Sequence, residues 1–159
     1  MNGRRRRQQK TTCLIVCEGK ADKSFLDFLK QTYQNSTWSF RVEKAGGDPQ
    51  SVIRRAKKIC SGYDEVYCIS DNDKDITMSI PRSITSLRIS PCLEAFLLKI
   101  VYDQSVSQNI KSTFETYFSR EAQKIDKDEW ARRISKEQLE SWRVNFSELN
   151  ALIEIFENP

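Results

Sequence analysis

Over the first hundred residues, short strand-like runs alternate with segments of helical periodicity. The strand-like runs are either apolar and rich in β-branched residues or alternating in polarity: 11–17, 38–42, 65–70 and 86–90. Apolar residues recur at helical spacing in the segments 22–33, 49–60 and 91–101, which separate or follow these runs. Such alternation is typical of a parallel sheet. We therefore predict a compact Rossmann-like α/β domain with about four parallel strands flanked by helices.

The rest of the chain, 104–159, lacks a convincing strand-like run and is predicted to be helical, with a last helix near 147–156. We expect its aromatic residues to be mostly core residues, with stacking on nucleobases as the minor alternative: Phe114, Tyr117, Phe118, Trp130, Trp142 and Phe146. The chain is thus predicted to comprise a basic arm at 1–10, an α/β domain at 11–103 and a helical C-terminal extension at 104–159 packed on it.

The basic residues are unevenly distributed along the chain. The first ten residues hold Arg4–Arg7 and Lys10 and no acid, whereas the other 21 bases face 22 acids. The arm therefore carries a charge of +5 and the remainder −1. A basic arm of this kind binds phosphate backbones; a solvated terminus is the equally open alternative.

Apolar runs are too short for a membrane span. The longest uncharged ones, 13–17 and 95–98, fall far below the roughly 18 residues required. The first ten residues contain no apolar segment of a secretory signal. The five cysteines include no CxxC pair, so we expect reduced thiols, with Cys13 and Cys17 as small buried apolar residues. We therefore expect a cytoplasmic protein.

The sequence contains no histidine. This excludes Ser-His-Asp and Cys-His catalysis, HExxH metalloproteases and nucleases with a histidine base. Proton transfer must then come from Asp, Glu, Lys, Tyr, Cys or metal-bound water. Neither a P-loop nor a G-x-G-x-x-G motif is present, which disfavours both common modes of nucleotide binding.

Acidic residues follow two of the predicted strands. Glu18 ends the first strand, and Asp71 and Asp73 end the third. If the segment is extended, positions 71 and 73 point the same way, and the carboxyl ends of parallel strands form the usual binding edge of such a sheet. Converging carboxylates repel one another unless a hard cation neutralises them, and Mg²⁺ or Mn²⁺ prefers oxygen ligands. Asp22 and Asp75 are close enough in sequence to join an outer shell.

The Asp-Asn-Asp sequence has simpler interpretations. A plain turn after a strand is common and remains open as an alternative. An EF-hand loop fails, because its sixth position is Ile76 rather than Gly and its twelfth is Arg82 rather than Glu.

Four segments resemble a known family. They are LIVCEGKAD at 14–22, GGDP at 46–49, YDEVYCISDND at 63–73 and SPCLEAFLL at 90–98. In this order they resemble the RloB branch of the Toprim superfamily, whose members include topoisomerases, primases and nucleases. Pro-Cys-x-Glu before an apolar helix is the most specific of these motifs. The likeness covers most of residues 12–101.

The resemblance implies a metal-dependent phosphoryl-transfer centre. Glu18 matches the family glutamate, and Asp71 and Asp73 match its D-x-D pair, so these three are the expected catalytic and metal-binding residues. Asp22 and Glu94 match further carboxylates of the pattern. The implied cofactor is Mg²⁺ or Mn²⁺, the implied substrate is DNA or RNA, and an ABC or AAA-type ATPase is the implied partner in bacterial defence against phages. The expected substrate-binding residues are Lys20, Lys44, Gly46, Gly47 and Lys74, although a solvated surface position is the favoured alternative for each lysine.

Two features differ from the family pattern. Only the thirteen residues 76–88 separate Asp75 from Ile89, so the helix usual between the third and fourth strands is largely missing. Phe96 and Ile100 stand where the family tends to have Trp and His. These differences favour the alternative of a catalytically weak Toprim module that binds nucleic acid or a partner protein, whereas the intact acidic residues favour a nuclease.

Overall fold

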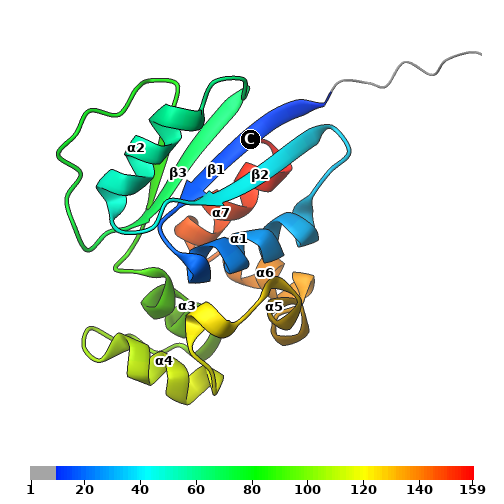
Figure 1. The fold of residues 1–159 in the computed structure, drawn as a ribbon. Helices are drawn as coiled ribbons and strands as arrows, with labels where there is room; N and C mark the ends of the chain where they lie inside the picture. The colour runs from blue at the N-terminus through cyan, green and yellow to red at the C-terminus, as the bar shows by residue number, and fades with distance from the viewer. Residues whose placement is uncertain (1–9) are drawn as a thin grey trace, which may run out of the picture.

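The computed structural model describes residues 10–159; the predicted basic arm at 1–10, apart from Lys10, lies outside the described residues. The described chain forms a four-stranded parallel sheet in the order β2-β1-β3-β4 (Figure 1). The strands are β1 (Thr11–Cys17), β2 (Trp38–Lys44), β3 (Glu65–Asp71) and β4 (Thr85–Ile89). At the end of β1, Cys17 is paired with Lys44 of β2 and with Ile69 of β3. The predicted parallel α/β architecture is confirmed.

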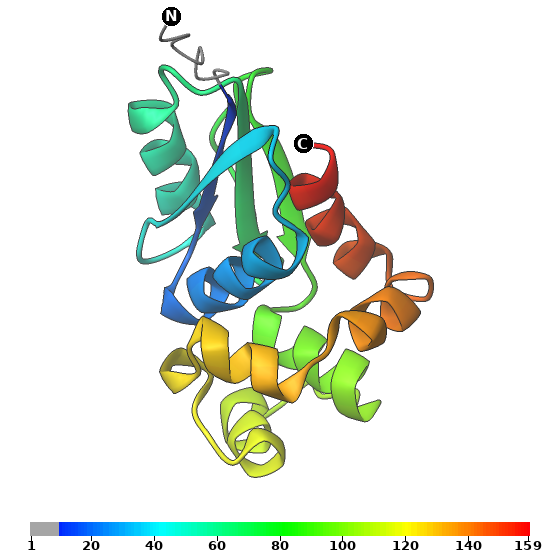
Figure 2. The same ribbon diagram turned by 90° about the vertical axis from the view of Figure 1, so that its right-hand side faces the viewer.

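Helices cover both faces of the sheet. Their bounds are α1 (Lys20–Tyr33), α2 (Pro49–Ile59), α3 (Leu93–Tyr102), α4 (Ile110–Phe118), α5 (Lys127–Arg133), α6 (Lys136–Arg143) and α7 (Ser147–Glu157), with a 3₁₀ turn, η1, at Ala122–Lys124. Figure 2 shows α2 on one side of the sheet and α1 and α7 on the other. Within residues 10–159, no helix is both long and apolar enough to cross a membrane.

The first strand is buried on both of its faces. Cys13, Ile15 and Cys17 belong to a large core shared with α1, α3 and the C-terminal helices, while Leu14 and Val16 pack with α2. All five side chains are fully buried. Two-sided burial explains why the segment is continuously apolar rather than alternating. The cysteines are free thiols, and Cys13 and Cys17 are buried as predicted.

The start of α2 follows from its sequence. The Asp48 side chain accepts a hydrogen bond from the backbone N–H of Ser51 at 2.9 Å, and Pro49 occupies the first helical position. An aspartate N-cap followed by proline is a favourable start for a helix. The helix buries Val52 and Ile53 against the sheet.

The segment 72–84, between β3 and β4, contains neither helix nor strand. Its apolar side chains pack against the α2 side of the core: Ile76, Met78, Ile80 and Ile84. The Gln50 side chain of α2 donates hydrogen bonds to the Asp75 carbonyl and to Thr77 Oγ1, both at 3.1 Å. An irregular segment thus covers the part of the sheet where the family pattern has a helix.

The C-terminal part is helical and packs on the α/β part through aromatic side chains. Trp130 is fully buried and makes edge-to-face contacts with Phe25 of α1 and Phe118 of α4, with ring centroids 5.5 and 5.6 Å apart. Its indole N–H donates to Ser24 Oγ at 3.2 Å. The prediction of core aromatics is confirmed for Phe114, Phe118 and Trp130, whereas Tyr117 is 39% exposed.

Element boundaries differ from the predictions by one or two residues. The helix expected from Asp22 begins at Lys20, because the Asp22 side chain accepts a hydrogen bond from the preceding Gly19 N–H and so caps the first turn. The second strand extends to Lys44, and the fourth is shifted one residue toward the N-terminus.

Candidate functional site

Glu18 and Asp71 meet at the centre of the sheet edge. Glu18 directly follows β1 and Asp71 ends β3, and these strands are neighbours. The chain runs from β1 outward to β2, then crosses to β3 on the other side, so the switch point of the sheet lies between the two residues. Glu18 Oε1 accepts a hydrogen bond from the Asp71 backbone N–H at 2.9 Å.

Two contacts hold Asp71 in place. Its Oδ1 accepts a hydrogen bond from the Leu93 N–H, at the start of α3, at 3.2 Å. Its backbone carbonyl accepts two from the Arg88 guanidinium of β4, at 3.0 and 2.7 Å. Arg88 also donates to the Lys74 carbonyl. The Arg88 side chain therefore determines the course of the chain immediately after β3.

Three acidic side chains at this edge have raised pKa values. Burial, followed by the negative charges of Asp22, Glu18 and Glu94, raises the pKa of Asp71 to about 8. The pKa of Asp22 rises to about 6, chiefly by burial and then by the charge of Glu94, although its hydrogen bond from Gly19 acts in the opposite direction. Burial also raises the pKa of Glu18. Each of these shifts records the cost of keeping negative charges crowded and partly removed from water.

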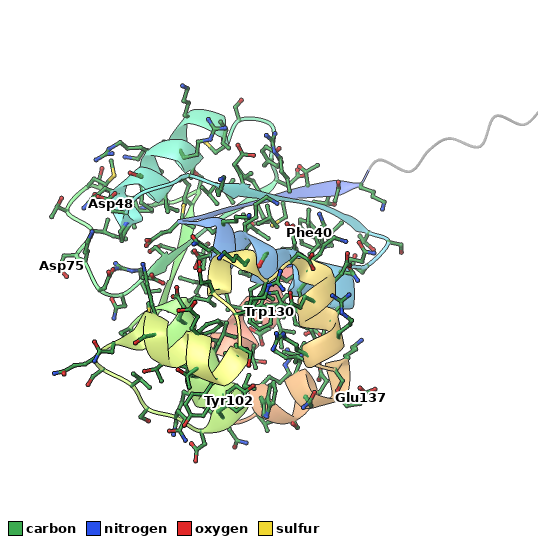
Figure 3. All side chains as sticks on the ribbon, turned by 60° about the horizontal axis from the view of Figure 1, so that its bottom comes forward. Phe40, Asp48, Asp75, Tyr102, Trp130 and Glu137 are labelled. Atoms are coloured by element: carbon green, nitrogen blue, oxygen red, sulfur yellow. The ribbon has the colours of Figure 1, made fainter. Side chains whose placement is uncertain are left out.

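A cavity of about 650 Å³ opens at this edge. Nine residues predicted for the site line it: Glu18, Lys20, Asp22, Lys44, Gly46, Gly47, Asp71, Asp73 and Glu94. Residues of α4 and η1 in the C-terminal part form its other wall. Figure 3 brings this end of the molecule forward, with α4 on one side of the region and the labelled Asp48 and Asp75 on the other.

Two predicted residues, Lys74 and Asp75, do not line this cavity. The Arg88 side chain donates a hydrogen bond to the Lys74 carbonyl, and the Gln50 side chain donates one to the Asp75 carbonyl. These bonds direct the backbone after Asp73 away from the cavity and toward α2. The extended geometry expected for positions 71 and 73 is also wrong, because β3 ends at Asp71 and Asp73 lies in a turn. Both carboxylates nevertheless line the same cavity.

The glycine pair adopts a backbone that other residues rarely accept. Gly46 and Gly47 have φ values of 76° and 96°, in the region that favours glycine. The Gly46 N–H donates to the Glu18 carbonyl at 2.8 Å, and a Cβ on Gly47 would approach Ser51 Oγ to 3.1 Å. The turn thus brings bare backbone to the cavity wall beside Glu18.

The donor set suits a hard cation, although the side chains are not gathered around one point. Oxygen donors from Asp and Glu are the ligands that Mg²⁺ and Mn²⁺ prefer. Across residues 10–159, however, no three acidic or cysteine side chains are grouped closely enough to hold a metal ion together. One oxygen each of Glu18, Asp22 and Asp71 accepts a backbone hydrogen bond. A shared ion would therefore require the carboxylates to rotate toward one another.

Sequence reasoning missed several residues of the site. Arg88 was recognisable only as a charge within a short, otherwise uncharged strand, SLRIS. Cys92 lines the cavity, and burial raises the pKa of its thiol to about 11, so it is protonated near neutral pH. Lys111 and Gln123 also line the cavity from the C-terminal part, and no motif identified them.

Comparisons of the chain with protein-family models, with curated proteins and with solved structures found no match. The resemblance to Toprim domains therefore depends on the four sequence segments alone. The function has to be inferred from the chemistry of the cavity.

Proposed function

We propose that the protein is a metal-dependent Toprim-type nuclease that cleaves phosphodiester bonds in DNA or RNA in the cytoplasm. The observation that carries this proposal is the meeting of Glu18 and Asp71 at the switch point of a parallel sheet, within one cavity. Ligands of open α/β sheets bind at this position.

Glu18, Asp71 and Asp73 would hold the Mg²⁺ or Mn²⁺, with Asp22 and Glu94 nearby in the same cavity. When bound, such an ion stabilises the charge that develops on the phosphate during displacement. Asp71 and Asp22 favour a nearby cation, because their raised pKa values reflect repulsion by neighbouring carboxylates as well as burial.

Other residues of the cavity suit a phosphodiester. Lys20 and Lys44 lie on the sheet side of the cavity and provide positive charge for the phosphate. The backbone of Gly46 and Gly47 permits close approach of a substrate. Glu18, whose pKa is raised by burial, is the candidate to accept or donate a proton.

The basic outer face of α2 supports a nucleic-acid substrate. Arg54, Lys57 and Lys58 are exposed there, and α2 begins next to the glycine turn of the cavity. Exposed basic residues beside a site bind phosphate backbones without regard to base sequence. A role in bacterial defence against phages, beside an ABC or AAA-type ATPase, belongs to this proposal through the sequence resemblance alone.

One observation favours the second candidate, a catalytically weak module that binds nucleic acid or a partner protein. Within the described part of the chain, the carboxylates are not arranged as a ready metal cluster. The two candidates differ in whether binding of nucleic acid is followed by cleavage in the presence of metal.

The test uses the full chain with tRNA, plasmid DNA and single-stranded DNA, in Mg²⁺, Mn²⁺ or EDTA. We expect metal-dependent cleavage that Asp71→Asn abolishes. Asp75→Asn is the matched control, because Asp75 is close in sequence but does not line the cavity, and it should retain activity. Binding without cleavage by the unaltered chain would support the second candidate, and equal loss in both variants would contradict the site.

A further inference from the structure

The cavity has a second wall that restricts what can enter it. On the side away from the sheet, the wall is formed by α4 and by η1 with the residue before it: Ile110, Lys111, Phe114, Glu115, Glu121, Ala122 and Gln123. The carboxylates therefore line an open pocket between the sheet and the C-terminal part.

From this wall we infer that the site takes about one or two unpaired nucleotides of a strand, and not a continuous double helix. The inference rests on the proposed function and names the form of nucleic acid that it acts on.

The first support is size. A cavity of 650 Å³ has the volume of a cube with an edge of about 9 Å. In double-stranded DNA, the gap between the strands at the major groove is already about 12 Å wide. A duplex is wider still, so it would have to stop at the rim formed by α4. Cavities of roughly 300–1,000 Å³ enclose small organic ligands, and one nucleotide belongs to that size class.

The second support is the half-buried apolar side chain of Ile110 at the start of α4. The sheet side carries the predicted acidic residues with Lys20 and Lys44, while Ile110 lies on the far side together with the charged Lys111, Glu115 and Glu121. A nucleotide has a charged phosphate at one end and a flat base that prefers apolar contact at the other. With its phosphate at the sheet edge, the base of an unpaired nucleotide can reach Ile110, which a paired base in a helix cannot do.

Among the four polar side chains of the far wall, Lys111 and Gln123 are the ones that can bind a strand. Lys111 is exposed at the first turn of α4, opposite the lysines of the sheet side, where it can bind a neighbouring phosphate of the same strand. Gln123 donates a hydrogen bond to Glu121 Oε2 at 2.9 Å, which orients its amide at the cavity. These residues are substrate-binding candidates outside the four Toprim-like segments.

The substrate test uses one end-labelled sequence in three forms: single strand, perfect duplex, and duplex with a central two-nucleotide bulge. We expect metal-dependent cleavage of the single strand and at the bulge, with the perfect duplex left intact. Cleavage of the perfect duplex at the same rate as the single strand would overturn the inference while leaving the nuclease proposal standing. Absence of cleavage of all three forms and of the tRNA and plasmid substrates would count against the nuclease proposal itself.

A second test targets Ile110 on the far wall by measuring the Kd for the labelled single strand in Ca²⁺. Ile110→Glu should weaken binding by about fivefold or more, because a charge replaces the surface against which the base packs. Val144→Glu is the matched control, since Val144 is 80% exposed on the outside of the molecule and should leave the Kd unchanged. A folded Ile110→Glu variant, checked by circular dichroism, that binds as the unaltered chain does would overturn the inference.

If Ile110→Glu does not fold, Lys111→Glu replaces it, because this side chain is exposed and contributes little to the core. Lys136→Glu on α6, which makes the same charge change away from the cavity, is its control. We expect at least about a threefold loss of single-strand affinity for Lys111→Glu alone. Equal affinities of the two variants would overturn the placement of the strand against α4.

Discussion

The carboxylate of Glu18 accepts a hydrogen bond from the backbone N–H of Asp71 at 2.9 Å, and this bond joins the ends of two neighbouring strands. The same side chain is both a structural hydrogen-bond acceptor and a candidate ligand and proton carrier. Substitutions can separate these roles, because glutamine retains a carbonyl oxygen that can accept the hydrogen bond, whereas alanine does not.

We predict that Glu18→Ala lowers the free energy of unfolding by about 1–3 kcal/mol, because it leaves the half-buried Asp71 N–H without its partner. Glu18→Gln should retain or slightly increase stability, since it also removes a charge from a crowded acidic site. Both variants should lose metal-dependent cleavage. Urea unfolding followed by circular dichroism measures the difference, and equal destabilisation by both substitutions would contradict the structural role of the hydrogen bond.

The raised pKa of Asp71 predicts how stability changes with pH in the absence of metal. The folded protein holds this proton up to about pH 8, whereas the unfolded chain releases it near pH 3.9. The folded state therefore binds more protons between these values, and stability falls as pH rises through that window. In EDTA, Asp71→Asn should lose less stability than the unaltered chain between pH 5 and pH 8.

Adding a divalent ion at high pH provides the control for this prediction. Mn²⁺ or Mg²⁺ added at pH 8 should raise the melting temperature of the unaltered chain, because a ligand that binds only the folded state stabilises it. The rise should be much smaller for Asp71→Asn. Parallel pH profiles of the two proteins in EDTA would mean that Asp71 titrates normally.

The sheet was predictable because its strands are specified by local patterns. Residues 13–17 are apolar on both faces of β1, and each face meets its own helix layer. The pairing of Glu18 with Asp71 was equally accessible, because strand ends in a parallel sheet share one edge. Sequence alone was sufficient wherever a side chain's position follows from its own strand.

The remainder of the site depends on tertiary contacts that no local pattern contains. Asp75 was expected near the site as an outer-shell residue, yet Arg88 and Gln50 bind the backbone of the loop, and of Asp73 and Asp75 only Asp73 lines the cavity. The far wall is likewise set by packing of the C-terminal helices around Trp130. These contacts join residues up to about a hundred positions apart, and periodicity does not reveal them.

Arg88 is predicted to position the site without touching the substrate. Its guanidinium donates hydrogen bonds to the carbonyls of both Asp71 and Lys74. The single ammonium group of lysine cannot reproduce this planar arrangement of donors. Arg88→Lys should lower kcat by about 10- to 100-fold with little change in KM, as is typical of residues that orient metal ligands. Arg82→Lys, at an exposed position in the same loop, is the matched control. An Arg88→Lys variant with unchanged kcat would show that the loop keeps its conformation without the guanidinium hydrogen bonds.

Trp130 is predicted to hold the far wall against the sheet part. Trp130→Ala should lower the free energy of unfolding by about 3–5 kcal/mol, because it opens a cavity between Phe25 and Phe118. Trp142→Ala, at a partly buried position on the edge of the same core, should have a clearly smaller effect. Urea unfolding measures both. A similar loss for the two tryptophans would indicate that the packing of Trp130 on α1 and α4 contributes little.

The final prediction concerns the basic face of α2. Arg54 and Lys58 are exposed, so replacing both by Glu should leave the fold intact and weaken nucleic-acid binding equally for all base sequences. For every phosphate that the variant no longer binds, the slope of log Kd against log salt should fall by about one. Arg132→Glu with Lys136→Glu makes the same charge change at exposed positions of α5 and α6 and should leave the slope unchanged.

Removal of residues 1–10 distinguishes this fixed face from the basic arm, nine of whose ten residues lie outside the described residues. If both regions bind phosphates, the deletion and the α2 charge reversal should each flatten the salt dependence, and their combination should flatten it further, with the cleavage pattern unaltered. If only the deletion has an effect, the arm supplies the nonspecific affinity and α2 is a solvated surface. If only α2 has an effect, the substrate reaches the cavity across the face beside Gly46 and Gly47, because α2 begins at that turn.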